Sequence, residues 1–326
     1  MYAAIKSIGS YVPNEKRNNQ WFVDRMDTSD DWITKRTGIS TRRIANKDEQ
    51  TSDMGVQASK IAIQRAGLTI DDIDLIICAT ISPDYYCMPS TACIIGQKLG
   101  TKDVMAMDIS AACTGFVYAL SIAKAFIESN MKKNILIIGA EKLSSIVDYT
   151  DRTTCMLFGD GAGASIISAT NDKNEAIIDI QCSSDGNLKD LLLTPNILNG
   201  EKQFIQMKGN ETFKIAVKTL VRDVQDIMKK NSMKNTDIDL FIPHQANYRI
   251  LKVVGDALKF EEKQKIITVQ KYGNTSSASI PMAMNDAYEN NKLKYGDTIL
   301  LDAFGGGLTW GSAIFRFAGK NINDNK

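Results

Sequence analysis

The chain has 326 residues, of which 44% are hydrophobic, so it can bury one large core or two smaller ones. Its 39 basic and 38 acidic residues nearly cancel, and this balance gives no argument for a nucleic acid or a membrane surface as a partner. One histidine and six cysteines without CxxC spacing argue against a zinc site, and the cysteines of so long a chain are expected to be reduced.

The first segment, MYAAIKSIGSYVPN, has Lys6 ahead of any long apolar run, which is not typical of a signal peptide. No stretch approaches the roughly 18 apolar residues that a spanning helix needs. We therefore expect a soluble, cytoplasmic protein. Neither GxxxxGK[ST] nor GxSxG occurs, which argues against a nucleotide loop and a serine-hydrolase elbow.

Two patterns occur twice along the chain at nearly the same offset. DDIDLIICATIS at 71–82 returns as TDIDLFIPHQAN at 236–247, and each contains an apolar run typical of a buried strand after a helix-like stretch. NILIIGAEKL, from Asn134, similarly matches DTILLDAFGGGL, from Asp297. The repeats predict a duplicated α/β chain with a mixed, largely parallel sheet in each half.

The polar stretch ATNDKNEA, 169–176, is the expected boundary of the duplication. It divides the chain into an N-terminal half, 1–170, and a C-terminal half, 171–326.

Cys113 lies among small side chains between strand-like VMAMDIS and helix-like TGFVYALSIAKAFIES. At the start of a helix its thiolate would gain from unpaired N–H groups and the helix dipole, so a lowered pKa and a reactive thiol are predicted. The alternative is a small buried hydrophobic side chain.

Two further polar residues occur where loops of the second half are expected to converge. His244, in FIPHQAN, follows an apolar strand directly, and the polar neighbours Gln245 and Asn247 favour a site over a histidine satisfied in the core. Asn274, in KYGNTSSASIP, is either a turn residue after glycine or an amide donor. The repeat places its segment opposite Cys113. Together the thiol, imidazole and carboxamide would suit acyl-transfer chemistry.

Two glycine-rich segments, FGDGAGASII (158–167) and AFGGGLTWGSAIF (303–315), lack the GxGxxG pattern and lead into strand-like sequence. They are predicted to form tight turns and close backbone approaches. The GGG run has a second plausible use as an oxyanion-hole donor beside the cysteine.

Seven motifs occur in one order over nearly the whole chain: DTSDDWITKRTGISTRRIA (27–45), SAACTGF, TDRTTCMLFGDGAGA, MKGNETFKIAV (207–217), IPHQAN, KYGNTSSASIP and FGGGLTWGSA. In these motifs the chain resembles β-ketoacyl-acyl-carrier-protein synthase III, a condensing enzyme. The resemblance implies an α/β, thiolase-like fold in which duplicated βαβαβαββ halves form αβαβα layers.

The resemblance also implies a catalytic triad of Cys113, His244 and Asn274. Cys113 would accept an acyl group from acyl-CoA, with its own N–H and that of Gly307 as the oxyanion hole. His244 and Asn274 would then hold the thioester carbonyl of malonyl-acyl carrier protein during decarboxylation, and the enolate would attack the acyl-cysteine. Acyl-CoA would be a substrate, and no permanently bound cofactor or metal is implied.

The same resemblance assigns the CoA contacts. Trp32 and Arg152 would sandwich the adenine. Arg36 and Thr28 would contact the phosphate end, and Asn247 would line the pantetheine tunnel.

The resemblance assigns the protein partners too. Lys214 and Arg249 would meet the acyl carrier protein, although Asp256 stands where a further basic residue is expected, and Lys252 and Lys259 would compensate.

Three positions concern the dimer and the surface. Met88 would be the gate that the partner subunit of a homodimer contributes to the acyl pocket. Arg42 and Arg43 are expected on a solvated basic face.

Three alternative functions compete with this interpretation. A thiolase would need a second cysteine near its C-terminus, whereas the last cysteine here is Cys182. A condensing enzyme that makes a quinolone or polyketide starter would share the triad. A non-catalytic acyl-CoA or redox-binding module would make the cysteine incidental. The length and branching of the starter chain stay open.

Overall fold

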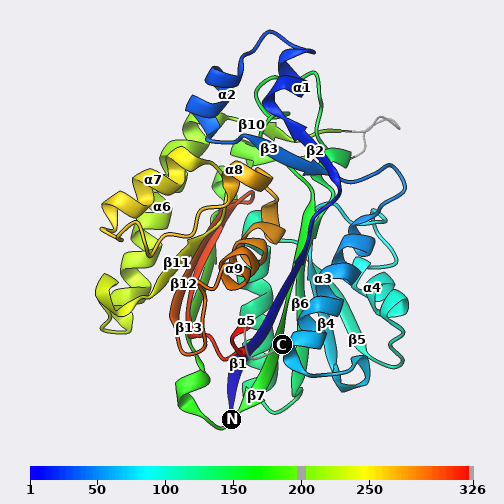
Figure 1. Cartoon of the computed structure of the whole chain (residues 1–326), viewed down its shortest axis with the longest axis vertical. Helices are drawn as coiled ribbons and strands as arrows, with labels where there is room; N and C mark the ends of the chain where they lie inside the picture. The colour runs from blue at the N-terminus through cyan, green and yellow to red at the C-terminus, as the bar shows by residue number, and fades with distance from the viewer. Residues whose placement is uncertain (197–202, 323–326) are drawn as a thin grey trace.

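The computed structural model describes residues 1–196 and 203–322 and contains two main sheets (Figure 1). The first has the order β1 (Tyr2–Tyr11), β7 (Gly161–Thr170), β6 (Asn134–Glu141), β4 (Leu75–Ala79), β5 (Met105–Ile109). The second has the order β11 (Leu240–Pro243), β12 (Thr298–Gly305), β13 (Thr309–Arg316), β8 (Ile177–Ser184).

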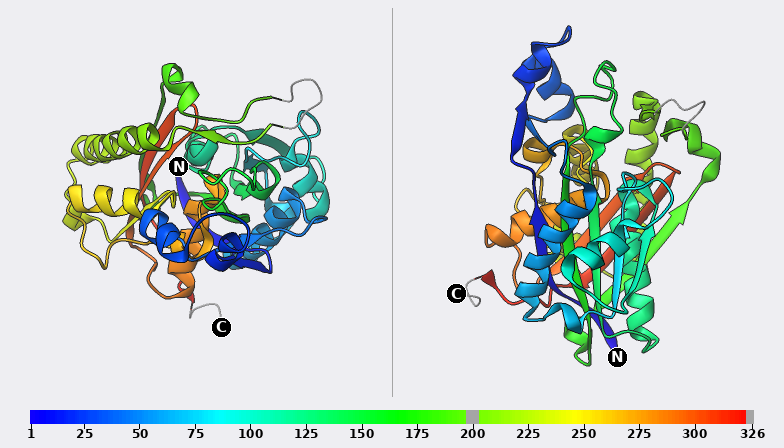
Figure 2. Two further views of the ribbon diagram at one scale, coloured as in Figure 1. Left: turned by 90° about the horizontal axis from the view of Figure 1, so that it is seen from above. Right: turned by 90° about the vertical axis from the view of Figure 1, so that its right-hand side faces the viewer.

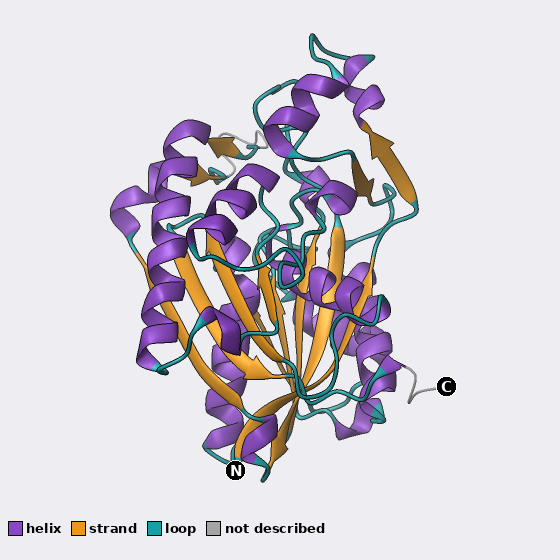
Figure 3. Cartoon of the chain, turned by 60° about the vertical axis from the view of Figure 1, so that its left-hand side comes forward, coloured by secondary structure: helices purple, strands orange, loops and turns teal. Residues whose placement is uncertain are grey.

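Helices lie on both faces of each sheet. They are α3 (Thr51–Ala66), α4 (Thr91–Leu99), α5 (Gly115–Glu128), α6 (Gly209–Lys230), α7 (Tyr248–Ala257) and α9 (Ser279–Glu289). Figure 1 and the view from above in Figure 2 show α5 and α9 between the two sheets, and Figure 3 shows helices packed around the strands. Helices α3 and α4 cover the outer face of the first sheet, and α6 packs with α7 on the outer face of the second. The predicted five-layered, thiolase-like α/β fold is confirmed.

Shorter elements complete the chain. They are β2 (Glu15–Asn18), α1 (Asn19–Val23), α2 (Asp30–Thr37), β3 (Thr41–Ile44), β9 (Leu192–Leu193), β10 (Gln206–Met207), α8 (Val269–Tyr272), and the 3-10 turns η1 (Ile70–Asp72), η2 (Ala112–Thr114), η3 (Leu143–Ser145), η4 (Lys173–Glu175), η5 (Gly186–Leu191), η6 (Asn235–Asp237) and η7 (Ser276–Ala278). Helices α1 and α2 form a cap at the end of the molecule opposite the N-terminus (Figure 2).

The burial of these elements follows from their composition. All five residues of β4, LIICA, are buried, because helices cover both faces of that strand. Helix α6 instead buries a stripe of residues three or four apart, such as Ala216, Leu220, Val224 and Ile227, as expected for a helix with one face in water.

The predicted duplication is visible in the strand order. In the first sheet the parallel pair β4–β6 is followed by two antiparallel neighbours, β7 and β1. In the second sheet the parallel pair β11–β12 is likewise followed by two antiparallel neighbours, β13 and β8. Strand β7 ends at Thr170 and β8 begins at Ile177, although the division of the chain at 170 stays a prediction.

The prediction of largely parallel sheets is wrong. Only β11–β12 is parallel among the three pairs of the second sheet, and the first sheet has two parallel and two antiparallel pairs. Three residues, 306–308, join β12 to β13, and so short a connection permits only an antiparallel hairpin. The counterpart of β5 is reduced to one isolated bridge between Phe241 and Lys265.

The expected solvated basic face is also wrong for Arg42. Its side chain is fully buried against the ring of Phe22, donates to the carbonyl oxygen of Met156 at 2.8 Å, and donates to Asn19 Oδ1 at 2.6 Å. Arg43 is only partly buried and reaches the carbonyl oxygens of two residues, Pro13 and Asn14.

Among the described residues, none of the helices is both long enough and apolar enough to cross a membrane.

Candidate active site

Two similar turns meet between the sheets, one from each half of the chain. Turn η2 begins at Ala112 with φ +46° and leads into α5, whereas η7 begins at Ser276 with φ +48° and leads into α9. A positive φ is unfavourable for residues other than glycine and is often found at functional sites. We call these turns the first and second elbow, and Cys113 lies on the first.

Cys113 is held tightly against the second sheet. A Cβ atom at Gly305, in β12, would lie 2.7 Å from the Cys113 nitrogen, so the approach requires glycine there. The thiol is 5% exposed, and the N-cap of α5 is Thr114, the next residue.

Cys113, His244 and Asn274 line one narrow cavity of about 110 Å³. They come from the first elbow, from the end of β11, and from the residue after α8 and Gly273. The structure therefore brings together the three side chains that the sequence predicted. Most of the other lining is apolar, including Phe213 and Phe304.

His244 is oriented by α9. Its Nδ1 lies 2.6 Å from Ser279 Oγ, and the backbone N–H of Gln245 donates to the same oxygen at 3.3 Å. The Ser279 hydroxyl has one proton and two lone pairs, and when it donates that proton to Nδ1 the ring carries its own proton on Nε2, which is then the N–H donor. Burial lowers the pKa of His244 to about 3, so the ring is neutral.

Asn274 is oriented by the second elbow. Its Oδ1 accepts from the backbone N–H of Ser276 at 2.8 Å, so the Nδ2 group is the part left to donate. The backbone of Asn274 is tied to Leu157 and Gly159 by hydrogen bonds of 2.8 and 3.0 Å.

The predicted lowering of the Cys113 pKa is wrong. Burial raises the pKa of the thiol to about 12, and the nearby carboxylate of Glu141 acts in the same direction. Ser276 lowers this pKa, and its effect is smaller than that of burial but larger than that of Glu141. The resting site thus holds a neutral thiol beside a neutral imidazole.

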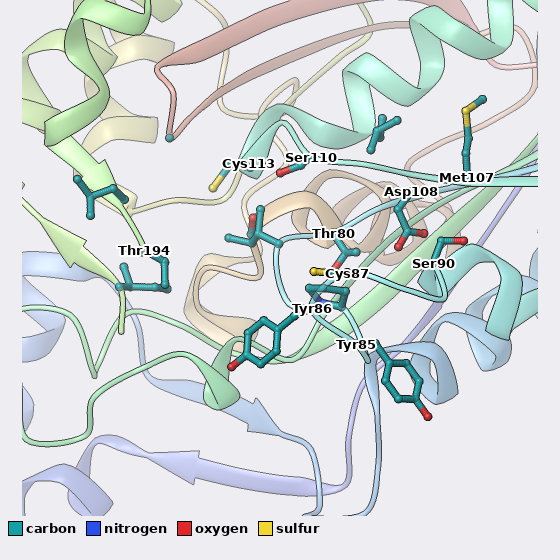
Figure 4. A pocket seen from close by; sticks show the side chains of 18 of the residues that line it. Thr80, Tyr85, Tyr86, Cys87, Ser90, Met107, Asp108, Ser110, Cys113 and Thr194 are labelled. Atoms are coloured by element: carbon teal, nitrogen blue, oxygen red, sulfur yellow. The ribbon is translucent and has the colours of Figure 1, made fainter. Parts of the chain in front are cut away.

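Cys113 also faces a wider cavity, of about 770 Å³ (Figure 4). Cys113, Phe158 and Leu192 line both cavities, so the thiol stands between them. In Figure 4, Tyr85, Tyr86 and Cys87 approach this space from a segment separate from that of Cys113.

The residues predicted to contact CoA lie close together. Trp32, on α2, has the guanidinium of Arg36 4.5 Å and that of Arg152 4.6 Å from its ring centroid. The Thr28 hydroxyl and Arg152 Nε are buried and make no hydrogen bond within the described ranges. Asn247 caps α7, donates to the carbonyl oxygen of Arg36 at 3.1 Å, and lines the narrow cavity.

Gln245, in contrast, does not line either cavity. Its side chain bonds to backbone groups of Pro243, Ile266 and Thr268, so it holds neighbouring segments together.

Gly306, the neighbour of the predicted oxyanion donor Gly307, lies close to Cys113. Gly306 lines the wider cavity with Cys113, and a Cβ there would lie 3.7 Å from that of Ala112. A Cβ at Gly307 would have atoms of Thr309 as its nearest neighbours, and Gly307 stays a predicted donor.

The predicted docking residues are on the surface. Lys214 (α6) and Arg249 (α7) are exposed, and the Arg249 guanidinium lies 5.3 Å from the ring centroid of Phe213. Asp256 pairs with Lys252 at 2.8 Å and Lys265 at 3.4 Å.

The gate residue is exposed as well. Met88 is 81% exposed and does not line the wider cavity of its own chain, although Cys87 and Pro89 do.

Comparison with known proteins shows which family the chain belongs to. Residues 107–186 match the family model for 3-oxoacyl-[acyl-carrier-protein] synthase III, and residues 228–317 match the model for its C-terminal part. The beta-ketoacyl-[acyl-carrier-protein] synthase III of Aliarcobacter butzleri is 62% identical over 98% of both chains. The Helicobacter pylori protein of that name is 56% identical over 98% of this chain and 99% of its own. This chain belongs to the β-ketoacyl-acyl-carrier-protein synthase III family.

Solved structures support the same assignment. The synthase III of Aquifex aeolicus superposes with a TM-score of 0.92 at 45% identity and covers 97% of this chain and 100% of its own. The priming β-ketosynthase of the R1128 polyketide pathway reaches the same TM-score at 30% identity, over 97% and 96% of the two chains. The chain is therefore a condensing acyltransferase of the thiolase fold.

Four residues around this synthase III site were not predicted. They are Arg42, Glu141, Ser276 and Ser279, all nearly inaccessible to solvent. The polar run NTSSAS was the available signal for the two serines, because four hydroxyl residues in and around one buried turn need hydrogen-bond partners. The sequence contained no such signal for Glu141, because it does not reveal that a polar residue at the end of a strand is buried.

Proposed function

We propose that this chain starts fatty acid synthesis by condensing a short acyl-CoA, with acetyl-CoA as the expected primer, with malonyl-acyl carrier protein. One observation carries the proposal: a thiol, an imidazole and a carboxamide from the two halves of the chain line a single narrow cavity. The thiol also faces the wider cavity. An acyl group bound to the sulfur can occupy that cavity, which leaves the narrow cavity to the second substrate.

In the first half-reaction the Cys113 sulfur attacks the acyl-CoA carbonyl and CoA leaves, with the thiol proton ending on the CoA sulfur. The N–H of Cys113 and that of Gly307, or of its neighbour Gly306, stabilise the oxyanion. Trp32, Arg36, Arg152 and Thr28 hold the nucleotide.

In the second half-reaction His244 Nε2–H and Asn274 Nδ2–H donate to the thioester carbonyl of the malonyl group. Loss of carbon dioxide then leaves an enolate oxygen between two donors, where its charge is stabilised. The enolate carbon attacks the acyl-cysteine and releases a 3-oxoacyl carrier protein.

The carrier protein docks near the opening of the narrow cavity. Lys214 and Arg249 give it a cationic surface, and Asn247 lies along the path of the arm. Lys252 is engaged by Asp256, so it contributes less charge than the sequence alone indicates.

The active form is a homodimer. Tyr85, Tyr86 and Met88 are 56%, 70% and 81% exposed at the rim of the wider cavity, and so apolar a patch favours a protein partner. A second copy would cover this patch and would insert Met88 toward its neighbour's acyl pocket.

The first test is intact mass after incubation with acetyl-CoA. The wild-type chain should gain one acetyl group, and Cys113→Ala should gain none, because the adduct is a thioester of that residue. No adduct with acetyl-CoA or another short acyl-CoA would contradict an acyl-enzyme and support a binding module.

A second candidate is priming of a secondary metabolite. The likeness to the R1128 enzyme and the volume of the wider cavity favour it. Condensation rates with malonyl-acyl carrier protein and with malonyl-CoA distinguish the two candidate functions. An enzyme of secondary metabolism should use both extenders equally well, whereas an enzyme that starts fatty acid synthesis should prefer malonyl-acyl carrier protein.

A further inference from the structure

The Ser276 hydroxyl is an unused polar group beside the nucleophile. Ser276 is 1% exposed, and within the part of the chain that the structure describes its Oγ makes no hydrogen bond of ordinary geometry, although it lies close enough to Cys113 and Glu141 to lower the pKa of both. Both Ser276 and Cys113 line the wider cavity. A buried hydroxyl without a well-formed hydrogen bond is unfavourable, so its position beside a reactive sulfur favours a hydrogen bond that strengthens as charge develops on that sulfur.

The second elbow is held by Glu141, at the end of β6. Ser277 Oγ lies 2.8 Å from Glu141 Oε1 and 2.8 Å from the carbonyl oxygen of Ala79. Glu141 Oε2 accepts from Ser82 Oγ at 2.6 Å and from the Ile81 N–H at 3.1 Å. These bonds tie the elbow to the ends of two strands of the first sheet.

The two elbows are in close contact. A Cβ at Gly139 would lie 2.3 Å from the Ser277 carbonyl oxygen, so only glycine lets the second elbow approach β6 this closely. A Cβ at Gly115, just after Cys113, would lie 3.4 Å from that of Ser277. The positive φ at Ser276 therefore occurs where the fold presses one elbow against the other.

We propose that Ser276 is a further catalytic residue, whose hydroxyl donates a hydrogen bond to the Cys113 sulfur as its negative charge develops. Ser276 keeps its proton throughout, and the thiol proton still leaves with the CoA sulfur. The inference rests on the proposed function only in taking Cys113 as the nucleophile.

The electrostatics of the site make such a donor useful. Burial raises the pKa of Cys113 to about 12, Glu141 also raises it, and Ser276 lowers it. His244 is the other titratable group beside the sulfur in the narrow cavity, and it is neutral. The Ser276 hydroxyl is thus the side-chain donor that counteracts these effects.

The test is the rate at which iodoacetamide alkylates Cys113 between pH 7 and 10.5. Loss of one hydrogen bond to a thiolate should raise the thiol pKa by about one to two units in Ser276→Ala. The thiolate fraction then falls about 10- to 100-fold, and because a more basic thiolate is more nucleophilic, the rate falls about 3- to 10-fold at each pH. Acetylation by acetyl-CoA should slow by a similar factor.

Two further variants separate the hydroxyl from the backbone. Ser276→Gly also lacks the hydroxyl but accepts a positive φ without strain, so it should slow alkylation as Ser276→Ala does. Ser277→Ala removes a hydroxyl from the same elbow and should leave the rate within twofold, even if stability falls. Peptide mapping follows Cys113 separately, and the exposed Cys87 and Cys93 serve as internal references.

An unchanged rate in both Ser276→Ala and Ser276→Gly would overturn the proposal. A reduced rate in Ser276→Ala alone would also overturn it, because backbone strain would then be the cause. Failure of the proposed function is distinguishable, since it would leave the wild-type chain without an acetyl adduct.

Discussion

At the scale of single residues, two serines of one short segment orient two of the three reactive groups. Ser276 fixes Asn274 through its backbone N–H and lines the wider cavity with Cys113, and Ser279 fixes His244 through its hydroxyl. Neither serine belongs to the predicted triad. A sequence motif identifies the groups that react, whereas the groups that orient them depend on hydrogen bonds visible only in three dimensions.

The buried imidazole predicts a dependence of stability on pH. The pKa of His244 is lowered from 6.5 to about 3 in the folded chain, so the unfolded chain binds its proton first as the pH falls. The free energy of unfolding should therefore decrease by about 1.4 kcal/mol per pH unit below 6.5, or about 2 kcal/mol by pH 5.

Urea unfolding of wild type and His244→Gln at pH 7 and 5 measures this loss. The difference between the two proteins isolates the effect, because His244 is the one histidine of the chain. Parallel changes in both proteins would contradict a neutral, buried ring.

At the scale of elements, Arg42 links the cap to the active-site loops. Arg42 donates to the Met156 carbonyl oxygen, in the segment whose backbone holds Asn274. It also donates to Asn19 in the cap, and the Nδ2 of Asn19 donates to Asp30 of α2 at 2.7 Å. The sequence of this strand, TRRI, contained a signal for the burial of Arg42. Side chains alternate along a strand, so Arg42 is buried on the same side as Ile44.

This link predicts unequal effects at two adjacent arginines. Arg42→Met leaves buried acceptors unpaired and should lower the free energy of unfolding by about 2–4 kcal/mol. Arg43→Met, its matched control, should cost less than about 1 kcal/mol. Denaturant titration of both variants measures the two changes in the free energy of unfolding. Equal decreases would show that Arg42 does not link the cap to the active-site loops.

The elements themselves were largely predictable from the sequence. Strands β4, β5 and β11, helix α5 and the turn holding Cys113 all lie where apolar periodicity and glycine content place them. The strand directions were not predictable, because hydrophobic pattern reports burial and leaves open which way a neighbouring strand runs.

At the scale of the whole molecule, the duplication explains why the site exists. Each half supplies a sheet and a central helix that begins at an elbow, and packing the halves face to face brings both elbows together. The exposed patch at the rim of the wider cavity is what a single chain leaves uncovered. Repeats in the sequence predicted the pairing of halves, whereas neither the elbow contact nor this patch has a local sequence signal.

Light scattering after size exclusion tests the proposed dimer. The wild-type chain should elute with the mass of two 36.0 kDa chains, and Met88→Asp should elute as one, because an unpaired charge is costly in an apolar interface. Met131→Asp, at a residue 66% exposed in another part of the chain, should leave the dimer intact. A monomeric wild-type chain would contradict the assigned gate.

The most direct test of the mechanism follows an acetyl group from the enzyme to its product. Purified acetyl-Cys113 enzyme, given malonyl-acyl carrier protein, should lose its acetyl mass as one carbon dioxide and one 3-oxobutyryl carrier protein form. The His244→Ala enzyme should stay acetylated, since the donor for the enolate is gone. Release of free acetate without a new carbon–carbon bond, or equal turnover by His244→Ala, would contradict the account.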